Sequence, residues 1–229
     1  MAWPKLADEA RGLTSNSPPE VDALYDGVTR LLDALDPSGR KVGDCTCGVY
    51  LFTDYDGEPI YVGQTKEKLR TRIRRHLTNQ RTDAVAMRVL DPFEVAEIEM
   101  WPFWDLAHKD VGDTLDRAEY TVYRRALFKS KFNAVLNEVE ITETELIDLP
   151  ESVRGAILPD EARESREHLD LRLARRARTI ADLARVISER QVSHGIRQTL
   201  WVQSRRLEHL ARTRLEELGG YAEDTTEEI

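Results

Sequence analysis

Apolar and aromatic residues gather on either side of a polar turn in residues 48–63 of this 229-residue chain. The turn, residues 54–57, contains an Asp-Gly pair, which is a strong short-range signal for a β-hairpin. We therefore expect two paired strands over residues 46–53 and 58–64. Apolar and acidic residues alternate in residues 93–100, a pattern typical of a half-exposed third strand.

Helical periodicity, with apolar residues every three or four positions, marks much of the remaining chain. The two longest helical patterns lie near the C-terminus on either side of His194-Gly195 and are expected to form an antiparallel helical hairpin. Ser17, Thr65 and Asp113 are the expected N-caps of three earlier helices. The predicted helices cover residues 18–35, 66–78, 83–89, 113–126, 142–147, 160–190 and 193–218.

These patterns predict an α/β (α+β) fold, a small three-stranded antiparallel sheet flanked by helices, with an N-terminal support helix and a C-terminal helical hairpin. One helix cannot bury its own apolar stripe, so the N-terminal helix must pack on the rest of the fold. Past Glu140 the composition shifts toward Arg, Glu, Leu and Ala, and the chain ends in an acidic tail. We therefore divide the chain into residues 1–44, 45–139 and 140–229.

Charge and composition exclude several classes of protein. No segment approaches the roughly 18 apolar residues that cross a membrane, and no secretion signal is recognisable, so we expect a cytoplasmic protein. A net charge of −9 argues against coating nucleic acid by bulk electrostatics, although residues 45–139 carry 14 Lys and Arg against 15 Asp and Glu. Cys45 and Cys47 give no disulfide framework and are expected to be half-buried thiols.

Candidate chemistry lies around the predicted hairpin. Tyr50 and Tyr61 each lie close to a glycine on a strand, where a ligand can approach the backbone closely. Arg72 and His76 are four residues apart on the flank of the following helix, beside its buried stripe, and with the tyrosines would form one polar patch. Glu119 lies on the buried side of a later helix, where either an arginine partner or a bound cation would have to compensate its charge.

Basic residues outside this patch have a simpler interpretation. Arg70 and Arg74 lie on the other side of the same helix and are expected to form a solvated basic face; with Gly63 they are the candidate substrate-binding residues. A second cluster on a C-terminal helix is expected to be an ordinary salt-bridged helix surface rather than a contact for DNA. That cluster consists of Arg172, Arg175, Arg176 and Arg178.

The order of these elements resembles the GIY-YIG nuclease family over residues 45–139. Gly48-Val49-Tyr50 is followed, after ten residues, by Tyr61-Val62-Gly63. Arg72 and His76 then occupy the first helix after the hairpin, Glu119 a later helix, and an aromatic-Asn pair follows. The closest similarity in style is to stand-alone restriction or defence endonucleases of that family.

The resemblance implies hydrolysis of DNA phosphodiester bonds with one divalent cation, Mg²⁺ or Mn²⁺. By similarity, Tyr50 would be the general base or would position the water, and Arg72 would grip the scissile phosphate. His76 would hydrogen-bond Tyr50 or the water, and Tyr61 would orient the phosphate or its arginine. Glu119 would be the sole carboxylate ligand of the cation. The family asparagine is assigned to Asn133, with Asn137 as the alternative.

The sequence therefore predicts a divalent-metal-dependent DNA endonuclease, with a role in restriction or genome defence. The alternative is a DNA-binding or scaffold module that has an inactive nuclease-like domain and acts through its helical C-terminal region. Cutting both strands with one site per chain requires two chains or two visits, so we also expect a homodimer, through residues 160–218.

Overall fold

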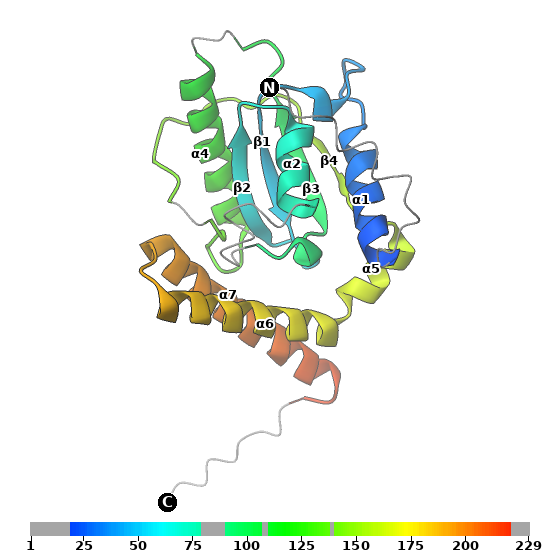
Figure 1. The fold of residues 1–229 in the computed structure, drawn as a ribbon, viewed down its shortest axis with the longest axis vertical. Helices are drawn as coiled ribbons and strands as arrows, with labels where there is room; N and C mark the ends of the chain where they lie inside the picture. Colours follow the sequence, from blue (N-terminus) through cyan, green and yellow to red (C-terminus); the bar gives the residue numbers. More distant parts are fainter. Residues whose placement is uncertain (1–18, 79–89, 107–109, 138–139, 221–229) are drawn as a thin grey trace, which may run out of the picture.

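A four-stranded antiparallel sheet forms the centre of the computed structural model, which describes residues 19–78, 90–106, 110–137 and 140–220 (Figure 1). The strands are β1 (Gly48–Thr53), β2 (Pro59–Thr65), β3 (Glu97–Pro102) and β4 (Val153–Ala156), in the order β2-β1-β3-β4. The expected mixed α+β fold is confirmed, but the expected three strands are four. The fourth strand has only four residues, too few for an alternation of apolar residues to be visible in the sequence.

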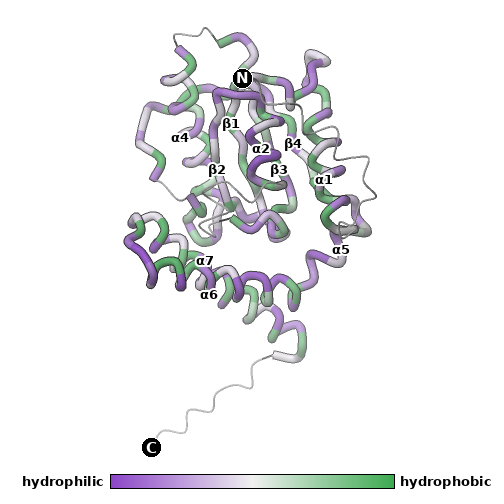
Figure 2. The backbone as a smooth tube through the Cα atoms, in the orientation of Figure 1, coloured by the Kyte–Doolittle hydropathy of each residue, from purple (hydrophilic) through white to green (hydrophobic). Residues whose placement is uncertain are grey.

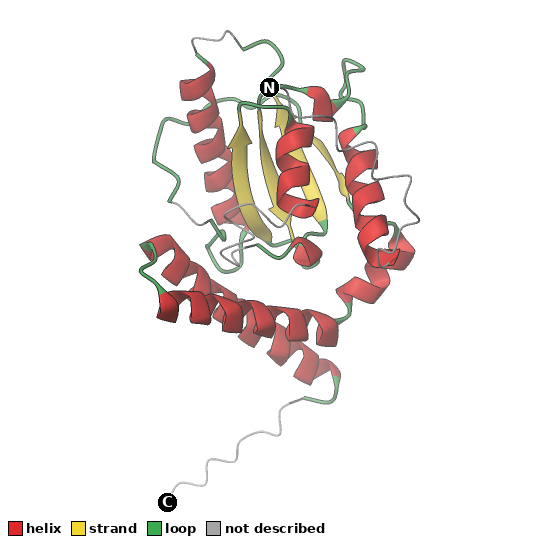
Figure 3. Cartoon of the chain, in the orientation of Figure 1, coloured by secondary structure: helices red, strands yellow, loops and turns green. Residues whose placement is uncertain are grey.

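Helices flank the sheet, and most were expected close to where they lie (Figure 3). Residues 142–147 are not helical, so that expectation is wrong, and the long pattern after residue 160 breaks at His168. Asp110 rather than Asp113 is the N-cap residue of the helix that carries Glu119. The expected cap at Ser17, the helix at 83–89 and the acidic tail after residue 220 lie outside the described residues. The helices are α1 (Pro19–Leu32), α2 (Leu69–Thr78), α4 (Val111–Lys129), α5 (Asp160–Glu167), α6 (Leu169–Glu189) and α7 (His194–Glu217), with short 3-10 turns η2 (Val42–Asp44) and η3 (Pro92–Glu94).

Alternate residues of β1 enter two different cores. Tyr50 and Phe52 belong to the core shared with α1 and α2, whereas Val49 and Leu51 belong to the core shared with α4. Successive strand residues point to opposite faces, so α2 and α4 cover opposite faces of the sheet (Figure 1). Strand β2 is an edge strand, and Leu136 and Asn137 hydrogen-bond to its outer side at Ile60 and Val62.

The helical hairpin of α6 and α7 lies across the end of the sheet that carries the β1–β2 turn (Figure 1). Hydrophilic and hydrophobic positions alternate along both helices (Figure 2), as expected of helices with one buried face. Their buried face includes Arg172 and Arg176, which are only 1% and 5% exposed, so the expectation of an ordinary helix surface is wrong for these two residues. Arg178 is exposed, as expected.

Buried arginines attach this hairpin to the β1–β2 turn, to η3 and to the start of β2. Arg172 donates from Nη1 and Nη2 to the two carboxylate oxygens of Asp56, at 2.8 and 2.6 Å. Arg176 Nη2 donates to Glu94 Oε2 at 3.0 Å, and Arg206 Nη2 donates to the carbonyl oxygen of Pro59 at 2.9 Å. The inner face of residues 160–218 is thus used within the chain, and nothing in the structure supports the expected homodimer through it.

No helix in the described part of the chain is both long and apolar enough to cross a membrane. Cys45 and Cys47 are free and buried, more deeply than expected. Burial raises the pKa of the Cys45 thiol to about 11, so it is an inert thiol at neutral pH.

Replacing Arg172 by alanine should lower the free energy of unfolding at pH 7 by about 3 kcal/mol or more, because the carboxylates of Asp54, Asp56 and Glu94 lose a buried cation. Burial would raise the pKa of Asp56, but the hydrogen bonds from Arg172 outweigh it and hold that pKa below its ordinary value. The stabilisation is therefore present above about pH 4 and is lost as the pH falls further.

Urea denaturation of the wild type and of Arg172→Ala at pH 7 and pH 3 measures this difference. The control is Arg178→Ala, which removes an exposed cation from the same helix and should cost less than about 0.5 kcal/mol. A loss in Arg172→Ala no larger than that of the control would contradict the buried pairing.

Candidate functional site

The side chain of Tyr50 lies directly over the backbone of Gly63. The two residues are partners in the β1–β2 register, and a Cβ added at Gly63 would stand 2.5 Å from the Tyr50 hydroxyl oxygen. Real Cβ atoms do not approach so closely, so only glycine leaves room for the phenol here. Gly63 therefore makes space for Tyr50, a role that the sequence-based assignment to substrate binding did not include.

Helix α2 places Arg72 and His76 next to this phenol. Leu69 and Ile73 bury the inner stripe of the helix, and a Cβ at Gly48 would meet the Leu69 methyl groups at 3.1 and 3.2 Å, so the helix lies close to β1. Arg72 Nε donates to the Tyr50 hydroxyl at 3.4 Å, a long hydrogen bond. The helix thereby holds a guanidinium against a buried phenol.

His76 is buried among aromatic rings. Its ring centroid lies 5.1 Å from that of Tyr61 and 5.9 Å from that of Tyr50, and the residue is 2% exposed. Neither ring nitrogen has a hydrogen-bond partner among the described residues, so the expected bond from His76 to Tyr50 is not made. Burial, together with the charges of Arg72 and Arg75, lowers the pKa of His76 to about 3, so the imidazole is neutral at physiological pH.

Glu119 lies on α4, at the outer edge of β2. Gln64 Nε2 donates to Glu119 Oε2 at 3.0 Å and to Asp116 Oδ1 at 2.6 Å. Burial raises the pKa of Glu119 to about 7; the charge of Asp116 adds to this, while Gln64 and Arg72 oppose it. No arginine forms an ion pair with Glu119 within the described residues, which disfavours the arginine partner and leaves the bound cation as the remaining alternative.

Gln64 was not among the sequence-based candidates. Its amide joins the two carboxylates, while its other polar atom, Oε1, is buried without a hydrogen-bond partner among the described residues. In the sequence, Gln64 is marked only by its position immediately after Gly63 on a strand, where it faces the opposite core from Tyr50. That position indicates a role in the site only once β2 is known to be an edge strand next to α4.

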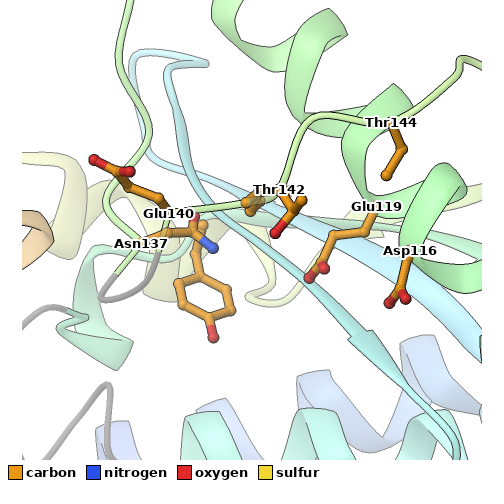
Figure 4. A pocket seen from close by; sticks show the side chains of 8 residues that line it. Asp116, Glu119, Asn137, Glu140, Thr142 and Thr144 are labelled. Atoms are coloured by element: carbon orange, nitrogen blue, oxygen red, sulfur yellow. The ribbon is translucent and has the colours of Figure 1, made fainter.

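An open pocket of about 370 Å³ lies at this edge (Figure 4). Tyr61 is the member common to the pocket and to the buried cluster, because it stacks on Tyr50 with a centroid separation of 6.3 Å. Residues 140–144, which lie between α4 and β4 in the chain, form one wall. The pocket is lined by Tyr61, Asp116, Glu119, Asn137, Glu140, Ile141, Thr142 and Thr144.

The two candidate asparagines lie in different places. Asn137 lines the pocket and pairs with the edge strand: its Nδ2 donates to the Val62 carbonyl oxygen at 2.7 Å, and the Val62 N–H donates back to Oδ1 at 3.3 Å. Asn133 is exposed in a turn with φ +49°, a conformation that asparagine tolerates, and does not line the pocket. These positions favour Asn137 over the assigned Asn133.

Arg70 and Arg74 face away from the pocket, toward α1. Arg70 Nη2 donates to Asp33 Oδ1 at 2.5 Å, and Arg74 Nη2 donates to Thr29 Oγ1 at 2.9 Å. Both side chains join α2 to α1, so their predicted role in substrate binding is not supported by where they lie.

The donors at the pocket suit a hard divalent cation. In the described residues, no group of three or more His, Cys, Asp or Glu side chains is arranged to hold a metal ion. The carboxylates of Glu119 and Asp116 both line the pocket, and Gln64 Nε2 donates to both of them. An all-oxygen set with few protein ligands is what Mg²⁺ accepts, since it keeps several waters.

Comparison with known proteins identifies one family. Residues 46–133 match the model of the GIY-YIG catalytic domain, which confirms the resemblance drawn from the sequence. Comparisons of the chain with curated proteins and with solved structures gave no match.

Replacing Glu119 by glutamine should stabilise the metal-free protein at pH 8 by about 2 kcal/mol, because a half-buried carboxylate of raised pKa is replaced by a neutral acceptor for Gln64. The pKa of Glu119 is raised in the folded state, so the wild type carries no penalty below about pH 4 and the full penalty above about pH 7.

Thermal or urea unfolding in a chelating buffer at pH 4 and pH 8 tests this. The gain in Glu119→Gln should be absent at pH 4 and present at pH 8, while the control Glu143→Gln, at an exposed position, should change little. Destabilisation of Glu119→Gln at pH 8 would show that the carboxylate is structural.

Replacing His76 by leucine should raise the free energy of unfolding by about 1 kcal/mol, because it removes two buried nitrogens without partners. Denaturation at pH 7 gives the value. If the histidine instead held the cluster together, the same variant would unfold more easily than the wild type.

Proposed function

The chain contains a GIY-YIG catalytic domain, a domain of nucleases, over residues 46–133, and we propose that it is a divalent-metal-dependent endonuclease that hydrolyses DNA phosphodiester bonds. One observation carries this proposal beyond the family match. Arg72, which is half-buried, donates to the buried phenol of Tyr50, and Tyr50 stacks on Tyr61. Tyr61 lines the pocket together with Glu119, a half-buried carboxylate of raised pKa.

Arg72 is the proposed ligand of the scissile phosphate. Its Nε is used on Tyr50, which leaves the terminal nitrogens of the guanidinium to face an anion. The planar fork of donors suits two oxygens of one phosphate, and positive charge there stabilises the pentavalent transition state. Lysine would keep the charge and lose the fork, so this substitution is not conservative at the site.

Tyr50 is proposed as the general base or as the group that positions the attacking water. A phenol with an ordinary pKa near 10 is a poor base at neutral pH unless cations stabilise its anion, and the Arg72 guanidinium at 3.4 Å supplies such a charge. Tyr50 is fully buried with its hydroxyl against the backbone of Gly63, so the proposed role requires the substrate and its water to approach the phenol at this edge of β2.

His76 serves this reaction as a neutral imidazole. Because its pKa is lowered to about 3, one nitrogen carries a proton and the other accepts one at working pH. Its unpartnered nitrogens lie beside the rings of Tyr50 and Tyr61, and we propose that the unprotonated one accepts a hydrogen bond from the phenol or the water.

Glu119 is the proposed carboxylate ligand of the cation, with Gln64 and Asp116 orienting it. When bound, Mg²⁺ or Mn²⁺ supplies positive charge to the phosphate and to the leaving 3′ oxygen. Gln64 holds one oxygen of Glu119 by its amide and leaves the carboxylate directed at the pocket (Figure 4). We assign the family asparagine to Asn137, whose amide keeps the edge of β2 in place.

A role in restriction or genome defence fits the architecture best. The helices that follow the domain pack against it through buried arginines, whereas a target-reading module of an intron-homing enzyme is typically separate and extended. Mapping cleavage positions on a long DNA tests this, since a defined recognition site supports the role and random nicking contradicts it.

Incubation of supercoiled plasmid with the protein and Mg²⁺ should give nicked and linear products. Tyr50→Phe and Glu119→Ala should each lower the rate at least 100-fold, because each removes a group proposed to act on the water or the cation. Tyr25→Phe, which removes a phenol oxygen from α1 away from the pocket, should cut at nearly the wild-type rate.

The pH profile separates two roles of Tyr50. If the phenol is the base, Tyr50→Phe loses the rise of rate with pH that the wild type shows; if it only positions Arg72, the profile keeps its shape at a lower rate. Intact plasmid with every divalent cation, or cleavage that survives Glu119→Ala, would contradict the proposed function.

A further inference from the structure

The two longest stretches of the chain without any Asp or Glu are residues 120–137 and 190–207. In a protein of net charge −9 such stretches are unusual, and each carries several cations. The first contains Arg124, Arg125, Lys129 and Lys131, and the second contains Arg190, Arg197, Arg205 and Arg206.

The fold brings these two stretches together. Phe132, just after α4, forms cation–π contacts with two arginines of α7. The guanidinium of Arg205 lies 5.7 Å from the ring centroid, and that of Arg206 lies 5.5 Å from it. The edge of the His209 ring packs on the same phenyl ring, with centroids 5.6 Å apart. The turn that follows α4 therefore lies against the middle of α7.

Aromatic side chains are exposed on the surface that results. Phe128, in the last turn of α4, is 95% exposed, and Trp201 on α7 is 57% exposed. Arg205 stacks on the Trp201 ring at 5.1 Å from its centroid. A phenylalanine almost wholly in water has no role in the packing of this chain, which points to a contact with another molecule.

The exposed cations of this surface are not neutralised. Within the described residues, no carboxylate forms an ion pair with Arg125, Lys129, Lys131 or Arg205, although ion pairs are frequent elsewhere on α6 and α7. We call these four residues, with Phe128 and Trp201, the cationic-aromatic surface.

This surface adjoins the pocket. Residues 130–137 run from it along the edge of β2, where the Leu136 N–H donates to the Ile60 carbonyl oxygen at 2.9 Å, and they end at Asn137 in the pocket wall. On the other side, His194 at the start of α7 lies 3.4 Å from Glu140, which also lines the pocket. A polymer that enters the pocket can therefore continue onto the surface.

We propose that the cationic-aromatic surface binds the phosphate backbone of duplex DNA flanking the scissile bond. The inference rests on the proposed nuclease function and extends it by assigning α7, outside the matched domain, to the substrate. Unpaired Arg and Lys neutralise phosphates and release counterions, and the exposed rings of Phe128 and Trp201 contact sugars or bases. A protein partner is disfavoured because the cores of protein interfaces are poor in charge.

Binding of a fluorescent 30-base-pair duplex in a chelating buffer, measured over a range of salt concentrations, tests the proposal. Lys129→Ala, Lys131→Ala and Arg205→Ala together should weaken binding at least tenfold and reduce the slope of log K against log salt by about 2 to 3, the value for three lost phosphate contacts. The control combines Arg30→Ala, Arg178→Ala and Arg190→Ala, which removes the same charge from exposed positions elsewhere and should leave the slope unchanged.

Phe128→Ser with Trp201→Ser should weaken binding with the salt slope preserved, because it removes uncharged contacts. If the wild type cuts and binds DNA while the triple Lys/Arg variant keeps its slope, the surface inference is wrong and the nuclease function stands. If the double aromatic variant keeps its affinity for DNA but changes the sedimentation of the protein, the surface is a protein interface. A wild type that neither cuts nor binds DNA contradicts both proposals.

Discussion

The contact between the Tyr50 phenol and the backbone of Gly63 is the constraint on which the rest of the site depends. It is possible only in the observed register of β1 and β2, and it directs the hydroxyl along the sheet surface to Arg72. The same register stacks Tyr61 on Tyr50, and the two rings with Phe52 enclose His76. A side chain at residue 63 would displace the phenol, and the arginine and histidine would lose their common neighbour.

The polar groups of the protein are satisfied to different degrees. Direct ion pairs join the helical hairpin to the β1–β2 turn and to η3, with Arg172 on Asp56 and Arg176 on Glu94, although the Nε atoms of both arginines have no hydrogen-bond partner among the described residues. Around the candidate catalytic residues, the nitrogens of His76 are buried without such partners, and partial burial raises the pKa of the Glu119 carboxylate. Polar groups that are buried without full compensation lower the stability of the ligand-free protein, and they are expected where a bound ligand supplies the missing partners.

The sequence predicted the elements whose signals are local. The Asp-Gly turn, the apolar stripe of α2 and the spacing of Tyr50, Tyr61, Arg72, His76 and Glu119 gave the hairpin and the residues around it. Contacts between distant segments gave no such signal. Arg172 and Arg176 have the spacing of a solvated helix face, and only the fold shows that the acidic turn covers them. The same reason explains why the sequence did not reveal that Arg70 and Arg74 contact α1, and why the fourth strand was missed. It also explains the choice of Asn133 over Asn137, because Asn137 pairs with Val62 on the distant strand β2.

The central claim is that a cation and a phosphodiester together relieve the uncompensated groups of the pocket. Thermal unfolding with a non-hydrolysable phosphorothioate duplex, with and without Mg²⁺, tests it most directly, because ligands that bind only the folded state raise the melting temperature. The melting temperature of the wild type should rise further when Mg²⁺ and the duplex are both present than with either alone. In Glu119→Gln the extra rise should vanish. An equal rise in the two proteins, or none in the wild type, would contradict the account.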